Sequence, residues 1–272
     1  MKLGVVITTY NSHVWLEKVL WGYENQIDRE FEIIIADDGS GKETKKLIKL
    51  FKERKTFPIS HVWHEDKGFR KTEILNKAIK NTDCDYLIFT DGDCIPRNDF
   101  IKTHKAKAKK GCYLSAAYYK LSMSVSELIS EDDIRSGRAF DYKWLVKNGQ
   151  QKSHKSLKLT CKNDSLLNFL TPTKATWNGA NSSAFKEDIL SVNGFDERMQ
   201  YGGLDVEMGE RMINGGIKGI QMRYSTICIH LDHKRGYSDP EIWKKNAEIR
   251  KQVKNKQSSW TKHGIIKNQI KS

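Results

Sequence analysis

The chain has 272 residues, and its 47 lysines and arginines outnumber its 34 aspartates and glutamates to give a net charge of +13. Hydrophobic residues make up 38% of the sequence, which supports a large folded core and excludes wholesale disorder. The apolar runs are far shorter than the roughly 20 residues that a membrane-spanning helix needs. The residues after Met1 do not follow the pattern of a signal peptide. The positive charge points toward a polyanionic partner such as nucleic acid, anionic lipid or a phosphorylated substrate.

The cysteines give a prediction about the redox compartment. Their number is odd, and no two of them have the CxxC spacing that is typical of zinc sites and redox motifs. We therefore expect reduced thiols in a cytoplasmic protein rather than a disulfide framework. The five residues are Cys84, Cys94, Cys112, Cys161 and Cys228.

Strand-like and helical patterns alternate in the first half of the chain. The predicted strands are 3–7, 31–36, 60–63 and 86–89, and the predicted helices lie around 16–23, 47–51 and 72–79. This rhythm predicts an α/β fold with a mostly parallel sheet covered by helices on both faces. Ligands of such sheets bind beyond the carboxyl ends of the strands, where the polar clusters 8–11, 37–40 and 91–93 fall.

The second half has a less regular pattern. It predicts a charged helix over 126–138, a lysine-rich loop over 150–164, a helix over 186–192 and a turn at 193–196. A helix over 205–214 should end at Gly215-Gly216, and 227–230 should form a short strand. The last 29 residues carry nine lysines and arginines and a single acid, Glu248.

The segment Asp91-Gly92-Asp93 follows a predicted buried strand. Two carboxylates that are one residue apart can share a divalent cation and a diphosphate bound to it, and oxygen ligands suit Mn²⁺ or Mg²⁺. The alternative is a solvated acidic turn. Asp37 and Asp38 also follow a strand, where a carboxylate can accept a hydrogen bond from a uracil N3–H or a ribose hydroxyl. The alternative there is a helix cap and turn.

Four further groups are candidates for a site. The first is the pair of cations Arg70 and Lys71, which precede a predicted helix and could bind phosphate or form a solvated basic turn. The second and third are Asp205 and Glu207, which lie at a helix start where an acid could act as a general base. Acids are favoured at that position by the helix dipole alone. The fourth is His230, with His233 close by, which could ligate a metal or be structural.

Together these motifs resemble those of a known family. Thr-Thr-Tyr-Asn at 8–11, Ala-Asp-Asp-Gly-Ser at 36–40 and Phe-Thr-Asp-Gly-Asp-Cys at 89–94 resemble a family 2 nucleotide-sugar glycosyltransferase with the GT-A fold, a Rossmann-like and mostly parallel central sheet flanked by helices. The segments 177–185, 193–197 and 201–207 resemble the C-terminal catalytic segment of β-1,4-galactosyltransferases, which bacterial chondroitin polymerase modules share.

The resemblance implies a role for each matching residue. Asp205 would be the catalytic base, and Asp93 and His230 would hold the metal, with His233 as the substitute if the register of the match slips. Leu204 stands where the family usually has an acid that helps to hold the acceptor. The implied ligands of the nucleotide-sugar are Thr8, Tyr10, Asp37, Asp38, Arg70, Lys71, Asp91 and Gly92. The implied acceptor-binding residues are Trp177, Tyr201, Gly203 and Glu207.

The resemblance also implies an activity and an organisation of the chain. The activity is an inverting, metal-dependent transfer of a sugar from UDP-Gal, UDP-GalNAc or UDP-GlcNAc to a hydroxyl of a glycan or lipid-linked glycan in surface polysaccharide or lipopolysaccharide synthesis. Residues 1–115 would bind the nucleotide-sugar, and 116–240 would complete the same domain with the acceptor-binding and catalytic half. The basic tail, 241–272, could contact an anionic membrane from the cytoplasm or cover the domain as a solvated helix.

Two other classes of protein compete with this interpretation. A nucleotidyltransferase would share the sheet and the acidic metal site, but it would not need the segment Gly-Gly-Leu-Asp-Val-Glu at 202–207. A nucleic-acid-binding protein would account for the net charge of +13. The basic residues are dispersed, however, and no recognition motif is present, so we expect no nucleic-acid partner.

Overall fold

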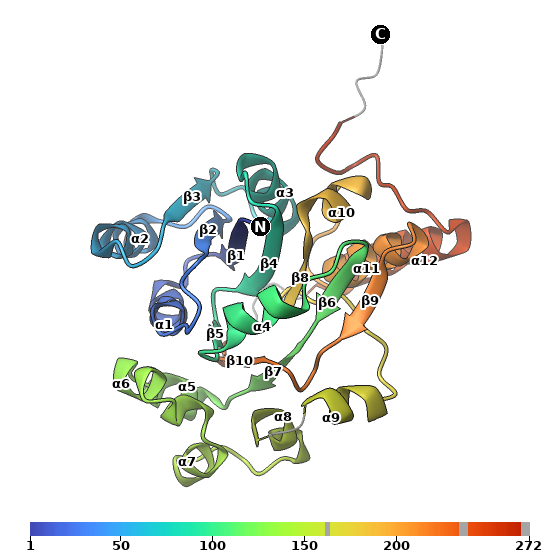
Figure 1. The fold of residues 1–272 in the computed structure, drawn as a ribbon. Helices are drawn as coiled ribbons and strands as arrows, with labels where there is room; N and C mark the ends of the chain where they lie inside the picture. The colour runs from blue at the N-terminus through green and yellow to red at the C-terminus, as the bar shows by residue number, and fades with distance from the viewer. Residues whose placement is uncertain (161–163, 234–238, 268–272) are drawn as a thin grey trace.

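The computed structural model describes residues 1–160, 164–233 and 239–267. Within these residues the main sheet has seven strands in the order β3-β2-β1-β4-β8-β6-β9 (Figure 1). In chain order they are β1 (Leu3–Thr9), β2 (Glu32–Asp37), β3 (Ile59–Trp63), β4 (Tyr86–Asp91), β6 (Cys112–Ser115), β8 (Ser182–Phe185) and β9 (Lys218–Gln221). Strands β1 to β4 are mutually parallel, whereas β8 runs antiparallel to both β4 and β6.

A smaller sheet lies beside the main one and pairs β5 (Cys94–Pro96), β10 (Ile227–His230) and β7 (Ala117–Lys120). Strand β10 is antiparallel to β5 and parallel to β7. The register sets His230 opposite Cys94, the residue that follows the acidic segment of the first half. This pairing brings the late histidine predicted from the sequence to the end of the predicted metal motif.

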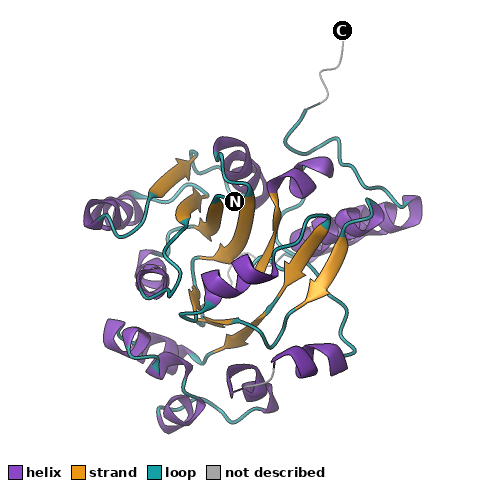
Figure 2. Cartoon of the chain, in the orientation of Figure 1, coloured by secondary structure: helices purple, strands orange, loops and turns teal. Residues whose placement is uncertain are grey.

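Helices cover both faces of the main sheet (Figure 2). One face carries α1 (His13–Glu24), α2 (Lys42–Arg54) and α4 (Phe100–Lys107), and the other carries α3 (Lys71–Asn81), α10 (Lys186–Ser191), α11 (Leu204–Asn214) and α12 (Pro240–Lys256). A further group of short helices lies against the smaller sheet (Figure 1). It consists of α5 (Met123–Leu128), α6 (Glu131–Arg135), η1 (Arg138–Phe140), α7 (Tyr142–Lys147), η2 (His154–Ser156), α8 (Leu157–Thr160) and α9 (Asp164–Leu170).

The parallel strands are apolar on both faces because both faces are covered. In β1, Val5 and Ile7 pack with α1 and α2, while Val6 packs on the opposite side with α3. Strand β4 alternates in the same way, with Ile88 on the first side and Phe89 on the second. The predicted mostly parallel α/β sheet with helices on both faces is therefore confirmed.

Most predicted elements of the first half are confirmed within one to three residues, but two predictions in the middle are wrong. The helix expected over 126–138 is divided into α5 and α6, because Ser130 forms a capping box with Asp133 and starts a new helix there. The loop expected over 150–164 contains η2 and α8, and Cys161 of that segment lies outside the described residues. The other four cysteines are buried free thiols.

The C-terminal segment is packed onto the second half of the domain. Helix α12 lies along α11, and its buried Asn246 donates hydrogen bonds to the carbonyl groups of Gln200, Tyr201 and Gly202 at 3.2, 3.1 and 2.8 Å. Thr261 then donates to Asp196 at 2.7 Å. The described part of the tail is thus an integral layer of the fold, while 268–272 lie outside the described residues. Of the described helices, none has both the length and the apolar character to cross a bilayer.

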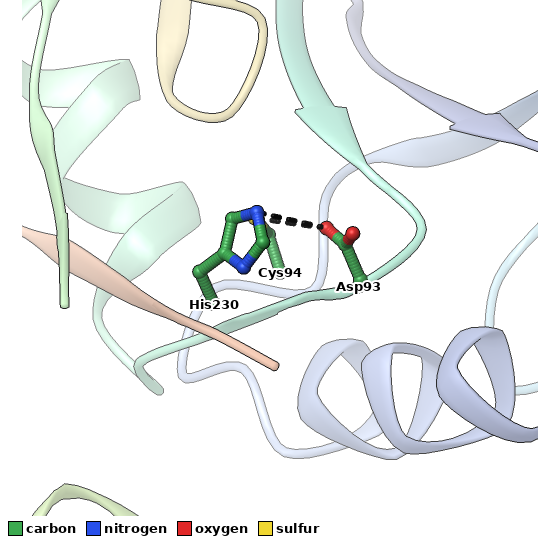
Figure 3. Close-up of side chains that lie close together, drawn as sticks. All are labelled: Asp93, Cys94 and His230. Atoms are coloured by element: carbon green, nitrogen blue, oxygen red, sulfur yellow. Dashed lines mark hydrogen bonds and ion pairs between the residues drawn. The ribbon is translucent and has the colours of Figure 1, made fainter. Parts of the chain in front are cut away.

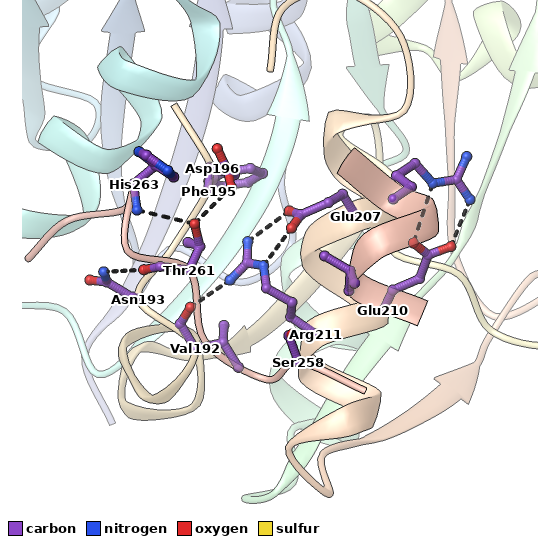
Figure 4. Close-up of polar contacts among 12 residues, drawn as sticks. Val192, Asn193, Phe195, Asp196, Glu207, Glu210, Arg211, Ser258, Thr261 and His263 are labelled. Carbon is purple, nitrogen blue, oxygen red and sulfur yellow. Dashed lines mark hydrogen bonds and ion pairs between the residues drawn. The ribbon is translucent and has the colours of Figure 1, made fainter. Parts of the chain in front are cut away.

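A fully buried ion pair fixes the start of α11 (Figure 4). The Arg211 guanidinium donates to both carboxylate oxygens of Glu207, at 2.7 and 2.8 Å, and also to the carbonyls of Val192 and Gly194. Neither side chain is exposed to solvent. Because each charge has its partners inside the protein, the pair links α11 to the Asn193-Gly194 turn without leaving a buried charge unpaired.

We predict that Arg211→Met lowers the free energy of unfolding by about 3–5 kcal/mol, because it leaves the Glu207 carboxylate buried without a counter-ion. Urea unfolding measures the change. Lys46→Met, which breaks an exposed pair with Glu43, is the control and should cost less than about 1 kcal/mol. Equal losses in the two variants would contradict the structural role given to the buried pair.

Candidate active site

The carboxyl ends of β1 and β4 bring three polar side chains together. Thr8 donates from its hydroxyl to Asp91 Oδ1 at 2.8 Å, and Lys71 Nζ donates to the same oxygen at 2.6 Å. The next residue is held against β1, since the Gly92 N–H donates to the Thr8 carbonyl at 2.7 Å. A Cβ at Gly92 would lie 2.8 Å from that carbonyl oxygen. Only glycine fits this close approach without a shift of the backbone.

Asp93 lies at the other end of the acidic segment and faces two histidines. His230 Nε2 is 3.8 Å from Asp93 Oδ1, and His233 Nε2 is 3.1 Å from Asp93 Oδ2. The two imidazole rings are stacked with centroids 5.6 Å apart. Figure 3 shows Asp93, the buried Cys94 and His230 converging on one point, and one ligand atom from each lies within 4.8 Å of the others.

This donor set fits a divalent cation. His230 Nδ1 lies 2.7 Å from the Leu231 carbonyl, which as an acceptor requires the proton on Nδ1. The lone pair of a neutral His230 is then on Nε2, the nitrogen that faces Asp93. An imidazole nitrogen with a fixed tautomer next to a carboxylate oxygen is a common arrangement at metal sites. His233 is nearer to Asp93 than His230 is, so both histidines are candidate ligands.

The Asp205 carboxylate lacks a full set of hydrogen-bond partners. It lies in the first turn of α11, after Gly203, whose φ of +78° places the backbone in the left-handed region. Asp205 Oδ1 is buried and accepts no hydrogen bond from any described residue. A Cβ on Gly179 would lie 3.0 Å from both carboxylate oxygens, so the bare Gly179 backbone forms one wall of this position. Burial, with a smaller effect of the Asp91 charge, raises the pKa of Asp205 to about 6 against the opposing attraction of Lys71.

Lys71 connects the two parts of the site. Burial alone would lower its pKa, but the negative charges of Asp91, Asp205 and Asp93 outweigh burial and raise the pKa of Lys71 above its usual range. Lys71 is therefore an ammonium cation at neutral pH. The same pairing, together with the Thr8 hydroxyl, lowers the pKa of Asp91 despite its burial. A fixed positive charge thus lies among carboxylates from β4, the turn after it and α11.

The two aspartates after β2 are held by the protein itself. Asp37 is fully buried, accepts from the Ser40 N–H at 2.8 Å and lies 2.8 Å from His61 Nε2. Asp38 lies 2.6 Å from His64 Nε2 and accepts from the Arg70 N–H at 2.9 Å. Burial would raise the pKa of Asp37, but its hydrogen bonds to His61 and Ser40 outweigh burial and lower that pKa. Asp37 thereby links the turn after β2 to β3, and Asp38 fixes the loop that leads into Lys71.

Tyr10 and Arg70 lie at the more open edge of this half. The Tyr10 ring is 50% exposed, and its hydroxyl donates to Asp66 at 2.8 Å. This hydrogen bond to a carboxylate raises the pKa of Tyr10. The Arg70 guanidinium donates to Glu73 at 3.1 Å. The tyrosine ring is therefore fixed at its tip while its face remains accessible.

Two predicted acceptor-binding residues cannot contact a sugar in this structure. Trp177 is fully buried, with its ring 5.4 Å from that of Phe89 and 5.7 Å from that of Tyr113. Glu207 is equally buried and uses both oxygens on Arg211. Strong apolar packing and a buried ion pair account for these two positions.

The other two predicted acceptor-binding residues, Tyr201 and Gly203, are less buried than Trp177 and Glu207. The Tyr201 ring is half-buried between Phe69 and Trp243, at centroid distances of 6.1 and 5.9 Å. Gly203 begins α11 directly before the turn that carries Asp205. Gly203 thus lies beside the turn that carries Asp205, and the Tyr201 ring packs against Trp243 of the C-terminal helix. An acceptor-binding role for these two residues stays a prediction.

Sequence reasoning missed three residues that shape the site. His61 and His64 hold Asp37 and Asp38, and Asp66 holds Tyr10. No spacing rule identifies them, because β3 and the loop after it approach the other strands only in the folded sheet. The signal that was available is weak: two histidines and two acids stand within 61–66, next to the basic segment 67–71.

With this geometry established, comparison with known proteins decides the family. The model of glycosyl transferase family 2 matches residues 4–155, more than half of the chain. The chain belongs to glycosyl transferase family 2. The matched region contains the Thr8 to Asp93 half of the site, and the family prediction is confirmed. The likeness of the C-terminal segment to β-1,4-galactosyltransferases stays a prediction.

Two curated relatives and one solved structure extend the comparison. An uncharacterized glycosyltransferase, YfnE of Bacillus subtilis, is 26% identical over an alignment of 263 positions that covers 86% of this chain and 65% of YfnE. Chondroitin synthase of Pasteurella multocida is 23% identical over 238 residues, covering 79% of this chain and 23% of the synthase. The chain thus spans at most about two thirds of these relatives.

The solved structure is a mannosyltransferase, PcManGT of Pyrobaculum calidifontis, in complex with GDP-Man and Mn²⁺. It superposes with a TM-score of 0.58 at 18% identity, over 87% of this family 2 chain and 58% of the mannosyltransferase. The likeness confirms the GT-A type of fold.

The raised pKa of Asp205 predicts that Asp205→Asn stabilises the fold in metal-free buffer at neutral pH. The pKa is about 6 in the folded state and 3.8 as the ordinary value, so the native chain loses stability as pH rises from about 4 to above 6. Two pKa units correspond to about 3 kcal/mol, an upper limit for the gain. Melting temperatures of the native chain and of Asp205→Asn, measured in EDTA, should therefore differ more as the pH rises. A difference in melting temperature that stays constant between pH 4 and pH 8 would contradict the raised pKa of Asp205.

Proposed function

We propose that this family 2 chain transfers a sugar from a nucleotide diphosphate donor to a hydroxyl group of a glycan acceptor, with inversion at the anomeric carbon. The observation that carries the proposal is Asp205. One oxygen of this carboxylate is buried without a hydrogen-bond partner, and its pKa is about 6. The charges of Asp205 and Asp93 both act on Lys71, and Asp93 belongs to the candidate metal-binding group with Cys94 and His230. A general base needs a pKa near the working pH and a free lone pair, and Asp205 has both.

The residues that would hold a metal are Asp93 with His230 and His233. Bound there, Mn²⁺ or Mg²⁺ would neutralise negative charge on the donor diphosphate. The Mn²⁺ in the complex of the mannosyltransferase is consistent with a divalent ion, and the neutral His230 tautomer supports the site in this chain. The hard carboxylate and borderline imidazole donors do not decide between the two ions.

The first half would bind the donor. Lys71 and Arg70 supply positive charge for the phosphates, and Thr8 and Asp91 hold the Lys71 ammonium in place. The exposed Tyr10 face would stack on the base, and Gly92 would let the donor approach the strand ends closely. Asp37 and Asp38 would act on the nucleotide indirectly, Asp37 through Ser40 and β3 and Asp38 through the loop before Lys71, because their oxygens are already bonded to protein groups.

Asp205 would accept the proton of the attacking acceptor hydroxyl. Asp91 is bonded to Thr8 and Lys71, and Asp93 faces the two histidines. These contacts leave Asp205 as the candidate base. One base supports one displacement from the face opposite the leaving group, and so supports inversion. Tyr201 and Gly203 precede the base in the turn that leads into α11 and would contact the acceptor. The half-buried Tyr201 ring would offer its accessible edge to a sugar.

The donor is proposed to be UDP-Gal, UDP-GalNAc or UDP-GlcNAc, and the product a surface polysaccharide or lipopolysaccharide made at the cytoplasmic side of a membrane. The match to chondroitin synthase supports a polysaccharide product, and the GDP-Man complex of the mannosyltransferase shows that proteins of this fold also use another base. A hydrolysis screen of UDP-, GDP- and dTDP-sugars with Mn²⁺ tests the donor.

We predict that Asp93→Ala abolishes the metal dependence of UDP binding and abolishes transfer while the chain stays folded. Calorimetric titration of UDP with and without Mn²⁺ measures the first effect. His230→Ala and His233→Ala, compared in the same assay, show which imidazole supports the metal. Asp83→Ala, which removes an exposed carboxylate just before the amino end of β4, is the control and should leave UDP binding unchanged. Metal-dependent binding that survives in Asp93→Ala would refute the metal site.

We predict that Asp205→Asn lowers turnover by ~10²-fold or more, because it removes the general base while keeping the shape. In the native enzyme kcat/KM should fall as pH drops below about 6, since Asp205 becomes protonated there. The variant should lose this acid limb and keep its affinity for UDP. If donor affinity collapses while the rate at saturation holds, Asp205 is a donor ligand instead.

A further inference from the structure

A second concave surface lies on the side of the molecule formed by β6, β7 and β9. It is a cavity of about 550 Å³, and the η2–α8 segment and the residues after α9 close its outer side. No aspartate or glutamate is among the residues that line it. Its cationic lining residues are Lys120, Lys152, Lys155, Lys158, Lys174 and Arg223.

The positive charges of this cavity are largely unbalanced. Lys120 forms an ion pair with Asp232 at 3.2 Å, but none of the other five cations forms an ion pair with a carboxylate of the described residues. Lys158 shows the consequence, since burial and then repulsion by Arg223 and Lys155 lower its pKa. Like charges held together in a partly desolvated hollow cost free energy, and a bound anion removes that cost.

The cavity adjoins the candidate active site from the second half of the chain. The ring of Tyr118, which lines the cavity, lies 5.4 Å from the ring of His230. Asn178, another lining residue, directly precedes Gly179, whose backbone forms a wall beside Asp205. The Lys71–Asp91 end of the site, by contrast, is built on β1 and β4 of the first half. The basic cavity thus borders the site at His230 and at the Gly179 wall beside Asp205.

We propose that this basic cavity binds a phosphate group of the acceptor and so places an acceptor hydroxyl near Asp205. The inference rests on the proposed function, which it deepens by naming the acceptor class. A phosphate group carries up to two negative charges on several acceptor oxygens, which suits a set of ammonium groups around one guanidinium. A carboxylate offers one charge and two oxygens, so it would compensate fewer of the five cations than a phosphate does.

The phosphate could belong to a soluble chain or to a lipid, and the structure suggests how to separate the two sources. Helix α9 carries Phe169 and Leu170, which are 85% and 63% exposed. Its Asn168 bonds to Tyr224 and Ser225, the residues that follow Arg223 of the cavity. An apolar tip beside a basic cavity suits a bilayer that presents phosphate headgroups. If the phosphate is on a soluble acceptor, the exposed Phe169 and Leu170 have no part in its binding.

The test uses the full chain with its donor site occupied by UDP and Mn²⁺, and glycerol 3-phosphate as the probe. Calorimetric titration should show binding that weakens at high salt. The variant Lys155→Gln/Lys158→Gln/Arg223→Gln should lose at least tenfold in affinity. The control variant Lys46→Gln/Lys49→Gln/Lys52→Gln removes the same charge from the exposed surface of α2 and should bind as the native chain does.

Sedimentation with vesicles of phosphatidylcholine containing phosphatidic acid forms the second arm. Phe169→Ser/Leu170→Ser should reduce vesicle binding without changing glycerol 3-phosphate affinity if the acceptor phosphate is on a lipid. Probe binding with no vesicle binding supports a soluble phosphorylated acceptor. The proposal is overturned if the native chain does not bind the probe, or if the triple cavity variant binds it as well as the control does.

Hydrolysis of the UDP-sugar, measured without acceptor, separates this inference from the proposed function. The cavity variant should hydrolyse the donor at the native rate, because its three residues are outside the donor site. The melting temperature of the cavity variant should equal or exceed that of the native chain, since the substitutions relieve repulsion at Lys158. A native chain that binds the probe but hydrolyses no nucleotide-sugar would refute the donor chemistry and leave the phosphate site standing.

Discussion

The ammonium group of Lys71 is the interaction on which the site depends. It lies among Asp91, Asp93 and Asp205, which come from two halves of the chain that are more than a hundred residues apart. Without a cation these carboxylates would repel one another in a partly desolvated space. Lys71 sits at the start of α3, and the Asp38 carboxylate fixes the residue before it through the Arg70 N–H. Asp38 therefore influences the chemistry indirectly, by fixing the residue before the central charge.

Much of this half could be predicted from the sequence, for a physical reason. Parallel strands buried on both faces are continuous apolar runs, and their carboxyl ends must meet at one edge, so Thr8, Asp37 and Asp91 could be placed together before any coordinates were known. The partners His61, His64 and Asp66 could not be placed, because β3 and its following loop contribute side chains whose direction depends on the register of the sheet.

The second half was harder to predict because its strands are not the continuous apolar runs that mark β1, β2 and β4. Strand β8 consists of Ser-Ser-Ala-Phe, and its serines are fully buried. Ser183 is stabilised by Tyr86 and by His104, each at 2.7 Å, which are contacts that no local pattern reveals. Motif likeness placed Asp205 at a helix start but also assigned contact roles to Trp177 and Glu207. A sequence motif contains residues of the core and of buried ion pairs as well as residues that contact a ligand. Trp177 and Glu207 belong to the first two kinds.

The buried Asn246 of α12 has a consequence for the order in which the molecule is assembled. Its amide bonds the carbonyls of residues 200–202, the glycine-rich turn that leads into the first turn of α11. The parallel half of the sheet is complete after β4, long before α12 emerges from a ribosome. The residues of the parallel half therefore precede, in synthesis, the helix that braces the turn before Asp205. A chain that ended before α12 would lack this brace although β1 to β4 were present.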